Sequence, residues 1–172
     1  MKRIVLLGLL VCTLFGYAQT QVRQDTTADS SFRIFLTEWE KAQSRFISGD
    51  PTLWKQHASH RDDVTILGGF GGYGDKGWDK VGARYDWASS QYKGGGATVK
   101  VEYVSIVVSG DLAFTVGIER QEGARVGDQQ HPGQRALRAT QVFRREDGDW
   151  KLMHRHGDPL VEKQMPSAAP KK

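Results

Sequence analysis

The periodicity of the sequence changes once, at Gly94-Gly95-Gly96, and this change limits the possible folds most strongly. Before these glycines, apolar residues recur at helical spacing. From Ala97 onward, the chain is rich in β-branched residues, with tight turns between extended runs. Helices followed by a run of strands are typical of an α+β fold, in which helices pack on one face of an antiparallel sheet. The sequence therefore predicts an α+β domain.

Three helices are expected before the glycines. Gly49-Asp50-Pro51 separates the first two, because glycine ends helices while aspartate and proline begin them. The second helix carries Trp54, and Asp75 is expected to cap the third. The first and third have apolar stripes at helical spacing: Phe32, Phe35, Leu36, Trp39, Ala42 and Phe46, then Trp78, Val81, Tyr85 and Ala88.

Four long strands are expected over residues 98–108, 112–121, 135–145 and 150–156, preceded by a short one over 63–67. Alternation places two sets on opposite faces of the first long strand: Thr98, Lys100, Glu102, Val104, Ile106 and Val108, against Val99, Val101, Tyr103 and Val107. Because both faces carry apolar residues, we expect helices to cover one face of the sheet and a second subunit the other.

Residues 1–18 have the pattern of a secretory signal: a positive start, an apolar run over 4–15 and small residues up to Ala18. The run is shorter than the about 20 residues that a membrane-spanning helix needs. The alternative is a lipoprotein signal in which Cys12 is lipidated. We expect cleavage after Ala18 and a secreted or periplasmic protein with no membrane attachment.

Composition excludes several classes of function. Cys12 is the only cysteine, so the mature chain has no disulfide, thiol nucleophile or zinc–thiolate site. The net charge is +4, but residues 30–162 contain eighteen basic and eighteen acidic side chains, which argues against a nucleic-acid partner. We expect one domain over 30–162, flanked by disordered segments at 19–29 and 163–172.

Several segments resemble SnoaL-like domains of the nuclear-transport-factor-two-like superfamily. They are Gly110-Asp111-Leu112-Ala113, Ile118-Glu119-Arg120, FISGDPTLWKQH, DDVTILGGFGG and the stretch from Leu137 to Pro159. The resemblance spans residues 31–161. It implies a cone-shaped, strongly bent antiparallel sheet packed against three N-terminal helices (a cystatin-like roll). It also implies a pocket on the concave face and a homodimer formed through the outer face.

The resemblance leaves the activity open, because this superfamily includes isomerases, hydrolases, cyclases, ligand binders and oligomerisation modules. We expect an exported domain that binds or transforms a small apolar, polyketide-like or steroid-like molecule, without a cofactor. The alternative is a non-catalytic dimerisation or ligand-binding module. An open pocket containing Glu119 or the histidines would favour the first hypothesis, and an interior filled by Phe35, Trp39 and Trp54 the second.

His154, His156 and Asp158 alternate on the last strand, so they are expected to share one face. Two imidazoles and a carboxylate are a possible metal-ligand set, and the alternative is structural hydrogen bonding near the sheet edge or dimer seam. We assign no metal, treat both histidines as candidate catalytic residues, and count Asp158 among the ligand-binding candidates. At least one imidazole is expected to form a buried hydrogen bond to a carboxylate or a backbone carbonyl.

Glu119 is the third candidate catalytic residue. Ketosteroid isomerase uses a carboxylate base in an apolar cone, and Glu119 lies beside the small residues Thr115 and Gly117. The alternative is a cross-strand ion pair with an arginine such as Arg138. The same superfamily includes the association domain of calcium/calmodulin-dependent kinase. The resemblance to that domain implies that Glu119 and Gln141 face the pocket. The remaining ligand-binding candidates are aromatic: Trp54, Tyr73 and Tyr85.

The signal pattern makes a direct prediction about the exported protein. Its intact mass should correspond to a chain that begins at Gln19, because Ala18 ends the expected cleavage site. An acylated Cys12 at the new N-terminus would contradict this expectation and support the lipoprotein alternative.

Overall fold

The computed structural model describes residues 26–162. The expected signal peptide, most of the 19–29 linker and the 163–172 tail lie outside the described residues. The helices are α1 Thr26–Phe46, α2 Thr52–His57 and α3 Trp78–Ser90. The strands are β1 Thr65–Leu67, β2 Asp75–Lys76, β3 Tyr92–Lys93, β4 Thr98–Ser109, β5 Leu112–Val126, β6 Gly133–Glu146 and β7 Asp149–Pro159.

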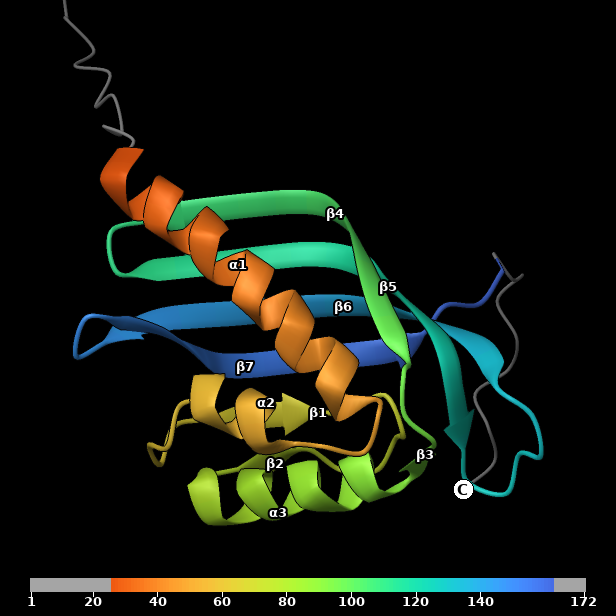
Figure 1. Ribbon diagram of the computed structural model, residues 1–172. Coiled ribbons are helices and arrows are strands. Elements are labelled where there is room, and N and C mark those ends of the chain that lie inside the picture. Colours follow the sequence, from red (N-terminus) through yellow and green to blue (C-terminus); the bar gives the residue numbers. More distant parts are fainter. Residues whose placement is uncertain (1–25, 163–172) are drawn as a thin grey trace, which may run out of the picture.

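The strands form one strongly curled sheet in the order β2-β1-β7-β6-β5-β3, with β4 also paired to β5. Figure 1 shows α1 lying across the concave face, with α2 and α3 near the β1 and β2 edge. The predicted α+β cone is therefore confirmed. One detail differs from the expected antiparallel sheet: β1 pairs with β7 in parallel, so the sheet is mixed.

Helix α1 follows the predicted apolar stripe, which it buries against the sheet. Phe32, Trp39 and Ala42 are completely buried, and Trp39 also stacks on Phe35. The helix begins at Thr26, so the expectation of disorder is wrong for residues 26–29, which form its first turn. Across residues 26–162, none of the helices combines the length and apolar character that crossing a membrane requires.

The two shorter helices both begin later than predicted. Helix α2 starts at Thr52 with Pro51 in the N-cap position, which was expected for Asp50. The Asp50 carboxylate still accepts a hydrogen bond from the Thr52 backbone N–H at 3.0 Å, and contacts with the Thr52 side chain and backbone lower the pKa of Asp50. The cap assigned to Asp75 is wrong. Asp75 pairs with Ile66 in the sheet, and α3 begins after Gly77, whose positive φ of 83° suits glycine.

A β-bulge changes the faces of β4. Tyr103 pairs with Gly117 and Ser105 with Val116, so Val104 is one extra residue on its strand. Val104 is 74% exposed. The bulge reverses the alternation, so Ile106 and Val108 pack on the core together with Val101 and Tyr103. Their assignment to the face of Thr98 and Lys100 is therefore wrong, because strict alternation cannot include an inserted residue.

A second bulge lies in β7. Val142 pairs with His154 and Phe143 with Leu152, which makes Met153 the extra residue. As a result Leu152 and Arg155 are both buried on the concave side, although three positions separate them. His154 and His156 share the opposite, outer side of the sheet.

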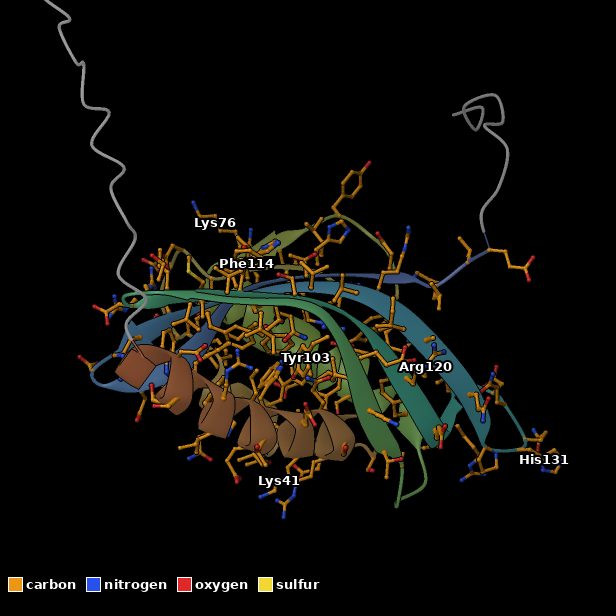
Figure 2. All side chains as sticks on the ribbon, turned by 90° about the horizontal axis from the view of Figure 1, so that it is seen from above. Lys41, Lys76, Tyr103, Phe114, Arg120 and His131 are labelled. Carbon is orange, nitrogen blue, oxygen red and sulfur yellow. The ribbon has the colours of Figure 1, made fainter. Side chains whose placement is uncertain are left out.

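The outer face of the sheet carries exposed apolar side chains on β4 and β5: Val104, Val107, Leu112 and Phe114. Figure 2 shows Phe114 on this side, whereas Tyr103 lies between the sheet and α1. None of the helices within 26–162 covers this face (Figures 1 and 2). We call these four residues the outer apolar patch.

The bulge in β4 brings its backbone close to Gly117. A Cβ atom at position 117 would lie 2.8 Å from the carbonyl oxygen of Glu102, which is closer than real Cβ atoms approach. We therefore expect Gly117→Ala to lower the free energy of unfolding, measured in urea, by about 1–3 kcal/mol. Gly95→Ala is the control, because a Cβ there has no neighbour within 4 Å, and it should change stability by less than about 0.5 kcal/mol. Equal effects would contradict the close approach.

Candidate ligand-binding site

One cavity lies between the helices and the concave side of the sheet. Its volume is about 50 Å³. A cavity of this size holds a few waters or one small group of a ligand. Its lining comes from α1, α2, α3, the loop after β1, β3 and strands β4 to β7: Gln43, Phe46, Ile47, Trp54, Ile66, Gly68, Gly69, Phe70, Arg84, Tyr85, Ala88, Tyr92, Val99, Glu119, Gln121, Arg135, Leu137 and Arg155.

A buried ion pair forms part of the cavity wall. Arg155 on β7 donates two hydrogen bonds to Glu119 on β5, at 2.5 and 2.7 Å. Gln141, on the intervening β6, donates to the same carboxylate at 2.7 Å and accepts one from the Trp39 indole at 2.7 Å. The pair is therefore connected through one side chain to α1.

Burial and charge act in opposite directions on this pair. Burial alone would lower the pKa of Arg155, but the bidentate contact with Glu119 raises it. The guanidinium also lies 5.5 Å from the centre of the Trp54 ring, within the range of a cation–π contact. Glu119 accepts three hydrogen bonds, two of them from a cation, so both of its carboxylate oxygens are already engaged within the protein.

Three polar atoms in the cavity wall have no hydrogen-bond partner. Among the described residues, four buried side-chain atoms lack one, and three of these belong to cavity-lining residues: Gln43 Oε1, Trp54 Nε1 and the Tyr85 hydroxyl. Burial raises the pKa of Tyr85 to about 12 against smaller, opposite effects of a contact with the Trp54 side chain and of the Arg155 charge, so its hydroxyl is neutral near pH 7. Buried polar groups are normally paired. Gln43 Oε1 lacks any partner within residues 26–162, and Trp54 and Tyr85 contact each other without forming a hydrogen bond of normal geometry.

The mouth of the cavity is less buried and more basic than its interior. Arg135 donates to the Tyr92 hydroxyl at 3.2 Å and to the Gly69 carbonyl, and its guanidinium lies 4.5 Å from the Phe70 ring centre. Tyr92 in turn donates to the Gln121 amide oxygen at 3.1 Å. The Phe70 side of the mouth is thus fixed by ordered polar contacts.

The predicted site residues fall into two groups. Glu119, Trp54 and Tyr85 line the cavity, and Gln141 lies directly behind Glu119. The Arg138 partner suggested for Glu119 is wrong, because Arg138 is on the outer face of β6 and Arg155 makes the pair. Tyr73 is 99% exposed in the loop between β1 and β2, away from the cavity lining.

The histidine motif lies on the outer face of the sheet, outside the cavity. His154 Nδ1 is 2.8 Å from the Thr65 hydroxyl, and His156 Nε2 is 3.0 Å from an Asp158 carboxylate oxygen. His156 and Asp158 are both about half exposed, so the expected buried bond to a carboxylate is wrong. Within residues 26–162, no group of three His, Cys, Asp or Glu side chains is placed to hold a metal ion.

The glutamines and arginines that line the cavity were missed by the sequence analysis: Gln43, Arg84, Gln121, Arg135 and Arg155. Alternation from Trp150 and Leu152 places His154 and His156 on the inner face, and only the Met153 bulge brings Arg155 there instead. Gln43 belongs to the buried side of α1, and a polar residue next to Ala42 in an apolar stripe was an available signal.

Comparisons agree with this architecture. The curled sheet around α1 and the cavity on its concave side define the cone fold of nuclear-transport-factor-2-like proteins. The model of the SnoaL-like domain matches residues 42–162, and the chain belongs to this family. No match was found among curated proteins.

Solved structures support the fold at low sequence identity. A nuclear transport factor 2-like superfamily protein from Salmonella enterica is 17% identical, with a TM-score of 0.68 over 83% of this chain and 98% of that one. A candidate dehydratase of the NTF2-like family from Streptomyces avermitilis is 20% identical, with a TM-score of 0.62 over 79% and 98%. An NTF2-like protein of unknown function from Pseudomonas putida is 22% identical, with a TM-score of 0.60 over 86% and 97%.

The buried ion pair predicts a large effect of a small substitution. Glu119→Gln leaves the buried Arg155 without a countercharge, so the free energy of unfolding should fall by about 3–5 kcal/mol. Glu102→Gln is the control, because Glu102 also receives two hydrogen bonds from an arginine, Arg120, but at the exposed surface. It should change stability little. Urea denaturation of both variants measures these changes. Similar losses of unfolding free energy in Glu119→Gln and Glu102→Gln would contradict the prediction.

Proposed function

We propose that this protein binds a small organic molecule in its interior cavity and acts as a ligand-binding protein rather than as an acid/base enzyme. One observation carries the proposal: Gln43 Oε1, Trp54 Nε1 and the Tyr85 hydroxyl, all buried and without a well-formed hydrogen bond within the described chain, belong to residues that line the same cavity. They offer one acceptor, one donor and one group that can do either. A ligand with a small polar group would satisfy them.

The remaining walls of the cavity are mainly apolar and aromatic, which fits the apolar part of such a ligand. Apolar and aromatic side chains alternate with a few polar atoms, which is typical of small-molecule sites. Trp54 and Tyr85 have ring centres 5.7 Å apart, and Phe70 and Tyr92 5.5 Å. The limited space favours a ligand whose inserted part is compact and flat.

The chemistry of Glu119 favours binding over catalysis. It is the only carboxylate among the cavity-lining residues of the described chain, and Arg155 and Gln141 occupy it. A general base needs a free, weakly solvated carboxylate, as in ketosteroid isomerase. The Streptomyces protein is a candidate dehydratase, and an analogous reaction here would require breaking this ion pair.

Thermal-shift screening of the purified protein against a metabolite library tests the proposal. A ligand that binds the folded state raises the melting temperature. Tyr85→Phe removes the hydroxyl and should weaken binding of a hit by roughly five- to tenfold. Tyr73→Phe, at an exposed position, is the control and should leave affinity unchanged. Equal affinity in both variants, or no hit at all, would refute binding in this cavity.

We also propose that two copies of the chain associate through the outer apolar patch. Val104, Val107, Leu112 and Phe114 form an apolar surface on neighbouring strands, with no cover in the described part of the chain. A two-fold axis across a patch of this kind is self-complementary, so a second copy is the natural partner. His154 and His156, on the same face, would then lie near the seam.

Light scattering at micromolar concentration tests the association. The protein should have the mass of a dimer, and Val104→Lys should convert it to a monomer because it places a charge within the apolar interface. Ile34→Lys is the control, since Ile34 is similarly exposed on α1 and should leave the dimer intact. A monomeric protein, or a Val104→Lys variant that stays dimeric, would contradict the proposed interface.

We further propose that the domain acts outside the cytoplasm, in the periplasm or the medium. The signal-like pattern of residues 1–18 supports this location. The intact mass of the exported protein tests this location. A chain that begins at Gln19 would support it, and a chain that retains residues 1–18 would contradict it.

A further inference from the structure

We propose that the mouth of the cavity recognises a carboxylate group of the ligand through Arg84 and Arg135. This inference rests on the proposed ligand binding and adds the chemical class of the ligand. The ligand would present its carboxylate at the mouth and its flat, compact part to the interior.

The charges of the lining residues point to an anion. The lining contains three arginines and one glutamate, and Glu119 neutralises Arg155 alone. Arg84 and Arg135 form no ion pair with any carboxylate in the described part of the chain. The mouth therefore has two positive charges without a countercharge, beside a cavity that excludes most water. Such a site attracts a negative group strongly.

Both arginines are held in place by neutral groups. The guanidinium of Arg135 lies over Phe70 and donates to Tyr92 and Gly69. That of Arg84 lies 4.5 Å from the Trp87 ring centre and donates to the Gly71 carbonyl at 2.5 Å. Positioning of this kind reduces the side-chain entropy that binding would otherwise cost.

Donors remain available on both side chains. A guanidinium carries five N–H groups, and the contacts within residues 26–162 use two at Arg135 and one at Arg84. The remaining planar donors match the geometry of a carboxylate, which arginine binds through paired hydrogen bonds. The contacts in place thus orient the two groups without saturating them.

Glycines in the loop after β1 keep the space at the mouth open. A Cβ at Gly69 would lie 3.5 Å from Arg135 Nη2, and one at Gly68 would lie 3.6 Å from Arg84 Nη2. The two guanidinium groups therefore pack against neighbouring residues of one loop, and both glycines line the cavity. Side chains at these two positions would lie against the guanidinium groups and, at Gly69, press on Leu137 at 3.0 Å.

The two ends of the site define the ligand. The carboxylate meets Arg84 and Arg135, a flat ring lies between Phe70 and Trp54, and a hydroxyl or similar group reaches Tyr85 and Gln43. The limited interior space excludes a large fused-ring body. A small hydroxyaryl carboxylate has these features, and 4-hydroxyphenylacetate is a suitable probe.

Calorimetric titration with matched probes tests the inference. We expect 4-hydroxyphenylacetate to bind at least about tenfold more tightly than its neutral amide, 4-hydroxyphenylacetamide, the factor expected from one charge-assisted hydrogen bond. Arg84→Gln and Arg135→Gln should each reduce the preference for the acid and leave affinity for the amide unchanged. Arg33→Gln is the matched control, because Arg33 is exposed on α1 and pairs with Asp29 outside the cavity. It should retain the full preference.

The outcomes separate this inference from the proposed function. Amides that bind as tightly as acids, or library hits confined to neutral compounds, would overturn the carboxylate site and leave cavity binding intact. Displacement of the acid by inorganic phosphate at equal concentration would overturn the assignment to carboxylate in favour of a general anion site. If neither probe binds and the library yields no hit, both proposals fail together.

Discussion

The bidentate contact between Glu119 and Arg155 is the interaction on which the interior of this domain depends. A buried charge is tolerated only when an opposite charge lies in hydrogen-bonding contact with it. The contact between Glu119 and Arg155 therefore holds β5 and β7 at a fixed separation across β6. Gln141 extends the same network to Trp39 and thereby sets the position of α1 over the sheet. The concave face cannot close as a purely apolar core at this point, and the cavity lies beside the pair.

The polar centre also explains why the site has two distinct parts. Inside, the charges cancel and the free hydrogen-bonding atoms are neutral, as at Tyr85 and Trp54. At the mouth, Arg84 and Arg135 interact with carbonyl oxygens and aromatic faces, none of which removes their charge. The domain therefore combines a neutral, flat interior with a positive entrance, although its net charge over residues 30–162 is zero.

Much of this arrangement follows from sequence periodicity. The stripe from Phe32 to Phe46 defines α1, and the turn residues after Val108 define the long hairpin. Alternation on β5 places Glu119 on the inner face beside Thr115 and Gly117. The two bulges could not be read in this way, since an inserted residue such as Met153 leaves no local pattern and reverses every assignment after it. For this reason His154 and His156 were candidate catalytic residues, and Arg155 between them was not considered.

The parallel pairing of β1 with β7 has a consequence for how molecules enter and leave. Ile66 pairs with Arg155 and Leu67 with His156, so the chain immediately before Gly68 is fastened to the strand that supplies the buried cation. The pairing of β1 with β2 holds the other end of the loop, so both of its ends are fixed to the sheet. By contrast, the Arg84 and Arg135 side chains are held by contacts of their own guanidinium groups with an aromatic ring and a carbonyl oxygen each. Either side chain can therefore rotate away from the entrance without breaking a backbone pairing of the sheet.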